Sequence, residues 1–427
     1  MTRLRRSDTD ACPGALRLHP AADGLLARVR LPGGALSGAQ LRSLGELAEE
    51  FGDGRLELTS RANLQLRALR AEDAQALAAR LRAAGLLPSA THDAVRNIAA
   101  PPLADDGVRG LVAGLDAAVR ADPRLAALPG KFLFAIGHVP LTADVAAVPA
   151  ADPAGRAGEH YALRFGGHDT GLRVSPTAVV PALLAGAHAF LAERAAQRTG
   201  AAAAWRLREL ADGPARVSAR VAEALGLAPA GVPAAAVVEV LEPGELVGVV
   251  IRNGQVAAGA LVPLGRLESV QTRVLQDAER LVVTPWRGVL ATDLTADGAA
   301  AWTARMAAAG LVVTATSRWT GVTACAGRPG CARSLADVRA DAEAATRFVD
   351  GLPAHWVGCG RACGSPAGRH VRVEATAAGY RIVGHPGDSA PAGGDPGGTA
   401  ADPGGAEVVA VGSAGALGDV VAEARRA

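Results

Sequence analysis

The sequence contains few aromatic residues and almost no lysine. Aromatic residues make up 3% of the 427 residues, and Lys131 is the only lysine among 44 lysine and arginine residues. Small aliphatic side chains, chiefly alanine and valine, must therefore fill the core, and arginine carries nearly all of the positive charge. The formal net charge is only +2, which creates no overall field that would attract nucleic acid or a membrane surface. Neither is therefore expected as a partner.

The sequence also lacks a segment suited to export or to membrane insertion. Its basic start, residues 1–6, leads into the polar run Ser7–Asp10 instead of an apolar region, so no signal peptide is predicted. The longest apolar stretch, near residues 225–241, is interrupted by Pro229 and Pro233 and is not expected to span a bilayer. These features predict a soluble cytoplasmic protein, in which thiols stay reduced.

Phosphate-binding glycine loops are a third absence. No G-x-G-x-x-G or Walker sequence follows a predicted strand, so no nicotinamide cofactor is expected to bind to this chain. Any electrons that the protein uses are therefore expected to come from an external donor, a reductase or a ferredoxin.

Cysteine is scarce but concentrated. Four of the five cysteines lie within 39 residues, as a C-x5-C pair, Cys325 and Cys331, and a C-x3-C pair, Cys359 and Cys363. Four thiolates suit an iron–sulfur cluster or a zinc ion. The five-residue gap is wider than in a zinc knuckle, and the surrounding glycines let the backbone wrap a bulky cluster. A [4Fe–4S] cluster is therefore the leading prediction, with zinc and with disulfides or unliganded thiols as the alternatives. Cys12, alone near the N-terminus, is interpreted as a bystander.

Strand and helix patterns near the N-terminus describe a β–α–β unit. Residues 15–18 and 25–31 resemble strands, and residues 55–59 are again extended. Between them Ser37 is placed to cap a helix. The apolar positions of this helix fall on one face at helical spacing: Leu41, Leu44 and Leu47.

The same unit recurs in the middle of the chain. Three matches share an offset of 225 residues, Gly34–Leu36 with Gly259–Leu261, Arg55–Leu56 with Arg280–Leu281, and Thr59 with Thr284. The shared offset favours an internal duplication, and the alternative is two unrelated units with chance matches. In the second copy we expect a strand near residues 246–251, a helix over 264–276 and a strand over 281–286.

The duplication predicts four half-domains in series. Two small β–α–β halves occupy residues 13–75 and 235–295, and larger α/β halves follow them at residues 76–220 and 296–385. A Gly/Pro-rich linker then leads to a short strand near residues 407–411 and a helix ending at Arg425, which together form the segment 386–427.

Polar residues follow the first copy of the repeat. In an extended chain Arg61, Asn63, Gln65 and Arg67 would share one face, because side chains alternate. Guanidinium and amide groups together make a good receptor for carboxylates. The alternative is an ordinary solvated strand face.

The cysteine pattern resembles the cluster motif of the sulfite and nitrite reductase superfamily. In that family four cysteines hold a [4Fe–4S] cluster, and the last of them also bridges to the iron of a sirohaem. The resemblance implies a mixed α+β (α/β) fold with internal duplication, in which two ferredoxin-like half-domains and two larger α/β half-domains have pseudo-twofold symmetry. It assigns Cys325, Cys331, Cys359 and Cys363 as the cluster ligands.

Three further motifs resemble those that line the tetrapyrrole pocket of the superfamily. They are a T-x-R-x-x-x-Q signature at residues 59–65, an Arg-Asn loop at residues 96–97 and an L-P-x-K-F segment at residues 128–132. The resemblance implies catalytic roles for Arg96 and Lys131. It implies tetrapyrrole-binding roles for Thr59, Arg61, Asn63, Gln65, Arg96, Asn97 and Lys131.

One departure from the family concerns the anion site. Sulfite reductases carry a second lysine two residues after the first, and this chain has Leu133 there. Reduction of a small oxyanion needs several cations, so the trimmed pocket is better suited to a large organic substrate or to dioxygen. This feature and the chain length resemble the precorrin-3B synthase branch of the superfamily, which belongs to the oxygen-dependent route to cobalamin.

The resemblance to that branch implies a reaction and its cofactors. Precorrin-3A would occupy the tetrapyrrole cavity, and O2 would hydroxylate its meso carbon between rings A and D while a ring A acetate closes into a γ-lactone. Electrons would pass through the [4Fe–4S] cluster, and a mononuclear non-haem iron would activate the oxygen. No ligand of such an iron is assigned, because His138, His160 and His168 fit no ligand motif and are interpreted as surface or hydrogen-bonded histidines.

Two alternative functions are retained. One is a sirohaem-dependent sulfite or nitrite reductase that tolerates Leu133. The other is a non-enzymatic iron–sulfur electron carrier or a tetrapyrrole-binding chaperone. The carrier is disfavoured because it has no need for cationic residues from separate loops.

Overall fold

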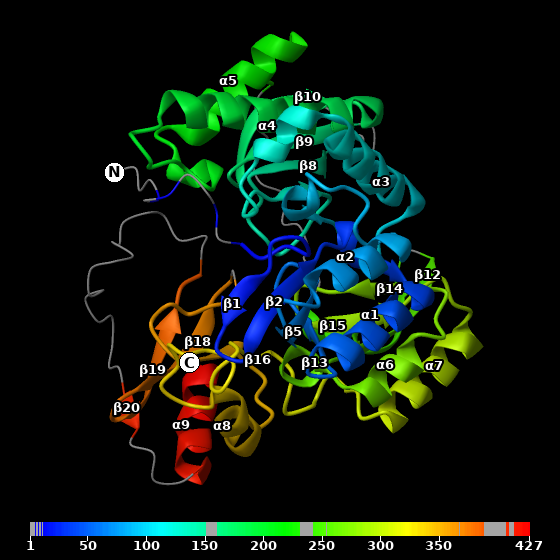
Figure 1. The fold of residues 1–427 in the computed structure, drawn as a ribbon, viewed down its shortest axis with the longest axis vertical. Helices are drawn as coiled ribbons and strands as arrows, with labels where there is room; N and C mark the ends of the chain where they lie inside the picture. Colours follow the sequence, from blue (N-terminus) through cyan, green and yellow to red (C-terminus); the bar gives the residue numbers. More distant parts are fainter. Residues whose placement is uncertain are drawn as a thin grey trace. The chain divides into compact units, whose positions relative to one another are not determined.

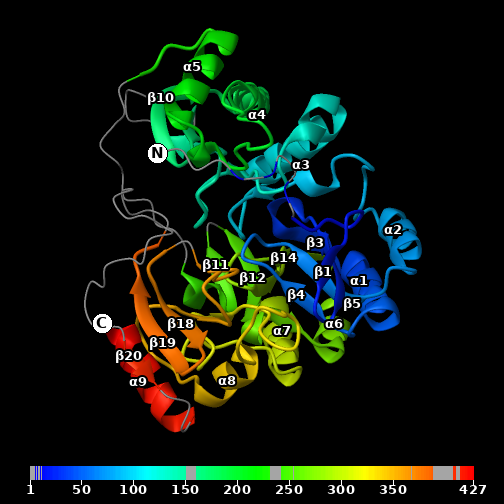
Figure 2. The same cartoon turned by 60° about the vertical axis from the view of Figure 1, so that its left-hand side comes forward.

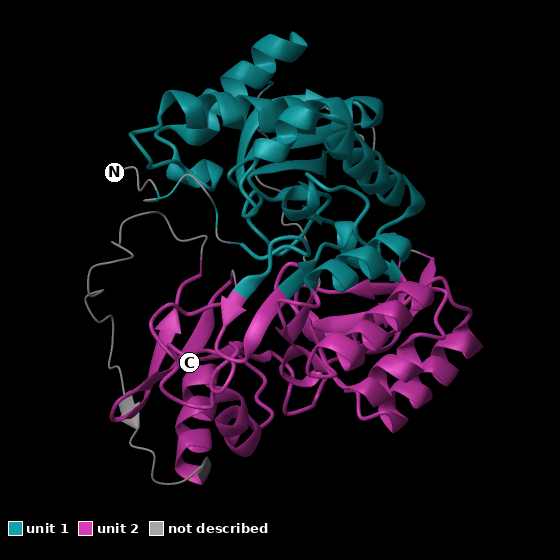
Figure 3. Cartoon of the chain, viewed as in Figure 1, with its two compact units in different colours: residues 1–19, 27–36, 74–240 teal, residues 20–26, 37–73, 241–427 magenta. Residues whose placement is uncertain are grey.

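The computed structural model describes residues 5, 7, 10, 12–150, 160–230, 242–252, 254–366, 368–387, 407–409 and 414–427. Two units divide the chain (Figure 3). Unit 1 comprises residues 1–19, 27–36 and 74–240, and unit 2 comprises residues 20–26, 37–73 and 241–427. The second copy of the repeat and the cysteine region therefore both belong to unit 2.

The first sheet contains the first copy of the repeat, in the strand order β1-β2-β5-β4-β13. Helix α1 begins with a reciprocal capping box, because Ser37 Oγ accepts the N–H of Gln40 (3.1 Å) and the Gln40 side chain accepts the N–H of Ser37 (3.0 Å). Its leucines at 41, 44 and 47 are buried, as predicted. The elements of this copy are β1 (His19–Ala21), β2 (Gly24–Val29), β3 (Ala35–Ser37), α1 (Gly38–Phe51), β4 (Leu56–Leu58), β5 (Leu64–Leu69) and α2 (Ala74–Ala83).

The second copy forms a sheet of the same design, in the order β11-β12-β15-β14-β3. Each of the two sheets contains four strands of its own copy and one short strand of the other copy. Strand β13 pairs antiparallel with β4, with Arg266 opposite Glu57 and Leu267 opposite Leu56. The elements of this copy are β11 (Gly248–Arg252), β12 (Gln255–Leu261), β13 (Arg266–Leu267), α6 (Ser269–Leu275), β14 (Arg280–Val283), β15 (Gly288–Ala291) and α7 (Ala296–Ala308).

The duplication is confirmed, but its predicted alignment is wrong over the first match. The 3-10 turn Pro32–Gly34 before β3 corresponds to the turn Pro263–Gly265 before β13, which is an offset of 231 residues. Gly259 lies instead within β12, the counterpart of β2. The offset becomes 225 only after the helix and the strand that follows it, because α6 is seven residues shorter than α1 and β14 is one residue longer than β4.

Three predicted boundaries also differ from the structure. The second-copy helix occupies Ser269–Leu275, and the strand after it occupies Arg280–Val283. No strand forms at residues 15–18. There the N–H groups of Ala15 and Leu16 donate to Asp93 Oδ2, at 2.6 and 3.1 Å. The hydrogen-bonding groups of this segment thus pair with a side chain and not with a neighbouring strand.

The two larger halves repeat each other as well. Their sheets have the orders β10-β9-β8-β7-β6 and β16-β17-β18-β19-β20. In each sheet the first three strands along the chain are parallel to one another. The fourth and fifth strands each pair antiparallel with the strand before them. The elements of the first are β6 (Ile98–Ala99), α3 (Asp106–Ala121), β7 (Phe134–Ile136), β8 (Val145–Ala150), β9 (His160–Phe165), β10 (His168–Val174), α4 (Val179–Ala196) and α5 (Gly213–Leu225). The elements of the second are β16 (Val322–Ala324), α8 (Val338–Ala345), β17 (Ala354–Val357), β18 (His370–Thr376), β19 (Gly379–His385), β20 (Glu407–Val409) and α9 (Ala414–Arg426).

Helix α4 is the main apolar helix of unit 1. Within the described ranges, Pro176–Ala196 is the one helix long and apolar enough to cross a membrane by length and composition. Of its apolar 18-residue stretch, 44% is buried inside the protein. Its side chains Leu183 and Phe190 belong to the hydrophobic core that also contains Phe132 and Phe165. The apolar stretch predicted not to span a bilayer lies largely outside the described residues, which stop at residue 230 and resume at 242.

Helix α9 at the C-terminal end packs into the core of the fourth sheet. Figures 1 and 2 both show α9 beside α8. Leu417 and Val421 of α9 lie in the same hydrophobic core as Val338 and Ala342 of α8. The guanidinium of Arg425 donates to the carbonyl of Leu352 at 2.7 Å. This helix therefore covers the sheet whose strands lead into the cysteine loops.

Candidate functional site

The four cysteines of the predicted cluster lie on two loops at one edge of the fourth sheet. Cys325 directly follows β16, and Cys359 comes two residues after β17. These strands are parallel neighbours, so their carboxyl ends meet at the same edge. The N–H of Cys325 donates to the carbonyl of Trp356 at 2.9 Å, which joins the two loops where they begin.

The thiols interact with one another and with the backbone. The N–H of Gly358 points at the sulfur of Cys325 at 3.3 Å, the kind of contact that tunes a ligating sulfur. Partial desolvation raises the pKa of the Cys363 thiol, and the neighbouring Cys325, Cys359 and Cys331 raise it further, although Arg361 opposes them. The three other thiols therefore lie close enough to act on Cys363, and ligation is the chemistry that would hold the four as thiolates.

Gly358 is required by its surroundings. A Cβ at this position would lie 1.8 Å from Ser334 Oγ, so no other residue fits without moving the chain. Ser334 belongs to the segment just after Cys331, and the N–H of Leu335 donates to the carbonyl of Gly358 at 2.9 Å. The glycine therefore lets the two cysteine loops approach each other closely.

The donor set fits an iron–sulfur cluster in its chemistry. All five cysteines are free thiols, which argues against the disulfide alternative. Within the part of the chain that the structure describes, no group of three or more His, Cys, Asp or Glu side chains is arranged to hold a metal ion. The assignment therefore rests on four soft donors in glycine-containing loops, and the four cysteines remain predicted ligands.

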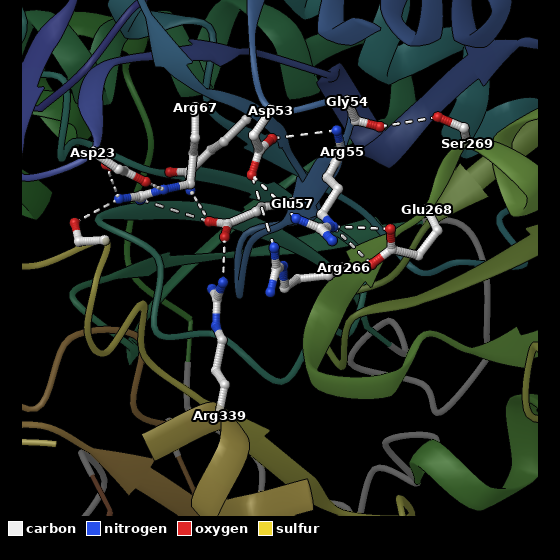
Figure 4. A network of polar contacts seen from close by, with 12 residues as sticks. Asp23, Asp53, Gly54, Arg55, Glu57, Arg67, Arg266, Glu268, Ser269 and Arg339 are labelled. Atoms are coloured by element: carbon white, nitrogen blue, oxygen red, sulfur yellow. Dashed lines mark hydrogen bonds and ion pairs between the residues drawn. The ribbon is translucent and has the colours of Figure 1, made fainter. Parts of the chain in front are cut away.

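A charged cluster, which we call the Glu57 network, lies beside the first cysteine loop (Figure 4). It consists of Asp23, Glu57, Gln65, Arg67 and Arg339. Glu57 on β4 is opposite Gln65 on β5, and its Oε1 accepts from Arg339 Nη1 at 2.6 Å. Its Oε2 lies 3.4 Å from Gln65 Nε2 and 3.7 Å from Arg67 Nη1. Burial raises the pKa of Glu57, but Arg339 and Arg67 outweigh that effect and hold the pKa below its ordinary value.

The two arginines of this network hold the two ends of the Cys325–Cys331 loop. Arg339 Nε donates to the carbonyl of Cys325 at 3.1 Å. Arg67 Nη2 donates to the carbonyl of Gly330 at 2.7 Å, while its guanidinium also forms a fork with Asp23 at 2.9 Å for both bonds. Because Glu57 links both arginines, one buried carboxylate organises the loop that carries two predicted ligands.

The polar residues after β4 do not all share one face. Gln65 and Arg67 lie on β5 and face Glu57, as an alternating strand requires. The prediction is wrong for Arg61, which lies in the turn before β5. There Thr59 Oγ1 accepts the N–H groups of Arg61 and Asn63, at 3.3 and 3.1 Å, and Ala62 adopts a φ of 57°. This compact turn interrupts the strand geometry that the alternation assumed.

The second copy of the repeat contains the same turn with one informative difference. Thr284 Oγ1 accepts the N–H of Gly288 at 3.0 Å, and the residue at the left-handed position is Arg287, with a φ of 59°. Arg287 is 8% exposed, and its Nη2 donates to the carbonyl of Gly364 at 3.2 Å. Burial lowers the pKa of Arg287 to about 10, and repulsion from Arg339 acts in the same direction.

The remaining predicted residues belong to unit 1. Arg96 forms a buried fork with Asp116 of α3, at 2.6 and 3.1 Å. Asn97 Nδ2 donates to the carbonyls of Gly130 (2.7 Å) and Phe132 (3.2 Å). The structure thus brings the Arg-Asn loop against the segment that carries Lys131. Their catalytic and tetrapyrrole-binding roles remain predictions.

Lys131 and Leu133 differ in their surroundings. Lys131 Nζ lies 5.2 Å from the centroid of the Trp205 ring, a cation–π contact. Leu133 is 3% exposed and packs in a small apolar cluster that includes Ala135 and Val148. The position where sulfite reductases carry a second lysine is therefore apolar here.

Sequence reasoning missed Glu57, Arg287 and Arg339. Glu57 had a usable signal, since it is a charged residue between two leucines of a short strand. Arg287 and Arg339 had no such signal, because Arg287 lies in a tight turn and Arg339 lies on a helix of ordinary composition. Arg287 meets the second cysteine loop across 77 residues, and Arg339 meets Glu57 across 282 residues.

Comparison with known proteins identifies the fold. Residues 19–84 match the family of nitrite/sulfite reductase ferredoxin-like half domains. The NirA protein of Mycobacterium tuberculosis superposes with a TM-score of 0.69 at 22% identity, covering 92% of this chain and 79% of that one. The chain therefore has the duplicated sulfite/nitrite reductase-like fold that the cysteine motif implied.

Similarity in sequence distinguishes two groups of relatives. The chain is 28% identical over 403 residues to precorrin-3B synthase of Sinorhizobium sp., which covers 87% of this chain and 82% of the relative. It is 36% identical over 152 residues to ferredoxin–nitrite reductase of Leptolyngbya laminosa, which covers 31% of this chain and 30% of that relative. The chain thus resembles precorrin-3B synthase over most of its length and the reductase over less than a third.

Proposed function

We propose that this protein is an oxidoreductase that uses O2 to convert precorrin-3A into precorrin-3B. The observation that carries the proposal is the extent of similarity, which reaches 87% of the chain for precorrin-3B synthase and 31% for ferredoxin–nitrite reductase. The apolar environment of Leu133 also supports it, because a cavity with fewer cations is better suited to O2 and a large macrocycle than to sulfite or nitrite.

The proposed reaction is a monooxygenation. One oxygen atom of O2 is added to the meso carbon between rings A and D. Two electrons and two protons reduce the other oxygen atom to water. The ring A acetate then closes into the γ-lactone. The electrons come from an external reductase or ferredoxin, and the protein contributes binding, orientation and access for O2.

The proposed substrate contacts are those of the motif residues. Precorrin-3A carries several carboxylates, which a guanidinium binds through two parallel hydrogen bonds. We assign this role to Arg61, with Thr59, Asn63 and Gln65 as polar neighbours. Arg96, whose guanidinium forms a fork with Asp116, and Asn97 are proposed as further polar contacts of the substrate. Lys131 and Arg96 are proposed as the catalytic residues, and the ammonium of Lys131 is held over the Trp205 ring.

The proposed cofactor is a [4Fe–4S] cluster held by the four cysteines. When bound, such a cluster relays single electrons between a donor and the substrate site. The chain's own part is to supply four thiolates, to direct the Gly358 N–H at the Cys325 sulfur and to hold both loops through Arg339 and Arg287. A cytoplasmic location, where thiols stay reduced, belongs to the same proposal. No residue is assigned to a mononuclear iron.

The absorption spectrum of purified protein tests the proposal against its alternative. A sirohaem sulfite or nitrite reductase is the second candidate, supported by the partial match to ferredoxin–nitrite reductase. Protein prepared without oxygen is expected to show the broad brown absorption of an iron–sulfur cluster, and to form precorrin-3B when precorrin-3A, O2 and a reductant are added. Intense Soret and red bands in stoichiometric amount, with reduction of sulfite or nitrite, would establish the alternative.

Substitution of Arg61 tests the substrate site directly. Arg61→Ala is expected to weaken binding of precorrin-3A by about 1.5–3 kcal/mol, the value of a charge-assisted hydrogen bond. Anaerobic absorbance titration measures the affinity. Arg70→Ala is the matched control, because Arg70 has an exposed side chain that pairs locally with Asp73. Equal affinity for the Arg61 and Arg70 variants would remove Arg61 from the site.

A further inference from the structure

Arg287 occupies a place built for its side chain. It lies in the turn between β14 and β15, and its guanidinium reaches the carbonyl of Gly364, the residue after Cys363. Two glycines make the necessary room. A Cβ at Gly265 would lie 2.5 Å from Arg287 Cδ, and one at Gly364 would lie 2.8 Å from Arg287 Nη2. The turn geometry and both glycines therefore direct this cation toward the second cysteine loop.

The positive charge of Arg287 is not balanced by a carboxylate in the way that the charges of the neighbouring arginines are. Arg67 is paired with Asp23, and Arg339 with Glu57. Among the described residues no carboxylate forms an ion pair with Arg287, although Glu57 acts on it from a greater distance. A buried cation without a nearby counter-charge is costly. We therefore expect an anion beside Arg287 in the functional protein.

The cysteine loops provide such an anion once they bind a cluster. Each ligating thiolate carries a negative charge, and Arg287 already contacts the loop of Cys363 through the carbonyl of Gly364. We propose that Arg287 is the counter-charge of the thiolate-bound cluster and raises its reduction potential. The reason is that a fixed positive charge in a low-dielectric site favours the reduced, more negative cluster. This inference rests on the proposed function, because it requires a cluster at these cysteines.

The test measures the midpoint potential of the cluster in the full-length protein. Arg287→Gln removes the charge but keeps a hydrogen-bond donor, and Arg287→Lys keeps the charge but loses the planar fork. Arg361→Gln is the matched control, since it removes the same charge at an exposed position between Cys359 and Cys363, where solvent screens it. Iron and sulfide content, the EPR spectrum of the reduced cluster and the potential are measured for each variant.

We expect the cluster of Arg287→Gln to be at least about tenfold harder to reduce, a shift of about 59 mV to more negative potential for one electron. Arg287→Lys should remain near the parent potential, and Arg361→Gln should shift less than Arg287→Gln. A parent-like potential in a fully loaded Arg287→Gln variant would overturn the inference and leave the proposed function intact. Should that variant fail to fold, Arg287→Met replaces the buried cation with an apolar side chain of similar length and is judged by the same criterion. If the parent protein itself takes up no iron and sulfide, the proposed function fails, and this inference fails with it.

Discussion

Replacing Cys359 with serine is expected to abolish the cluster and the oxidoreductase activity together. A serine hydroxyl is a poor ligand for iron at neutral pH, and a [4Fe–4S] cluster needs all four of its thiolates. Cys359 lies at the carboxyl end of β17, next to Gly358, whose N–H contacts the sulfur of Cys325. The measurement is iron and sulfide content per chain after anaerobic reconstitution, followed by the visible absorption spectrum.

Cys12→Ser is the matched control for that loss. Cys12 is the fifth free thiol of the chain and lies in unit 1, far from the cysteine loops in sequence. This variant should load iron and sulfide like the parent. A brown, fully active Cys359→Ser protein would instead contradict the ligand assignment, and equal loss in both variants would indicate general damage to folding.

Replacing Glu57 with alanine is expected to produce the largest loss of stability that we predict. The change leaves half-buried Arg339 without its ion-pair partner and leaves buried Arg67 with Asp23 alone. Breaking a buried ion pair by removing one partner costs about 3–5 kcal/mol. Both arginines also donate to carbonyls of the Cys325–Cys331 loop, so the loop should loosen with them. Urea unfolding of the cluster-free protein measures the stability, and the rate of iron release from the reconstituted protein reports on the loop.

Glu268→Ala is the control for Glu57→Ala, since Glu268 pairs with Arg55 where both side chains are largely exposed. Its loss should be within about 1 kcal/mol, as for other surface ion pairs. If Glu57→Ala were no more damaging than Glu268→Ala, the Glu57 network would not support the loop.

The contribution of Glu57 should also depend on pH in a defined direction. Its pKa in the folded protein is lowered, so the folded state favours the charged carboxylate. The stabilisation is therefore fully present above the unfolded pKa of about 4.3 and is lost as the pH falls through the lower, folded pKa. The difference in unfolding free energy between the parent and Glu57→Gln should consequently be large at pH 7 and shrink in strong acid.

Local features of the fold could be predicted well from the sequence. The capping box of Ser37 and Gln40 joins residues three apart, and the leucine face of α1 follows from helical spacing alone. The duplication was detectable for the same reason, although short matches could not reveal that α6 is half as long as α1. The offset was therefore correct after the helix and wrong before it.

Predictions that assumed regular geometry were less successful. Alternation along residues 61–67 was the basis for one shared face, but the tight turn at Ala62 takes Arg61 out of the strand. For Arg96 the motif predicts a residue beside a tetrapyrrole, which stays a prediction, and the structure adds a partner that the motif did not indicate, Asp116 of α3. Neither a turn with positive φ at an alanine nor a partner on a later helix follows from local sequence.

The sequence by itself determined the elements, the duplication and the spacing of the four cysteines, because these depend on residues close together in the chain. Only the tertiary structure decided which charges surround the cysteine loops. Glu57 and Arg339 are 282 residues apart, and Arg67 and Gly330 are 263 apart. Such pairs form only when the elements around the cysteine loops pack together, and their burial is what makes each charge matter.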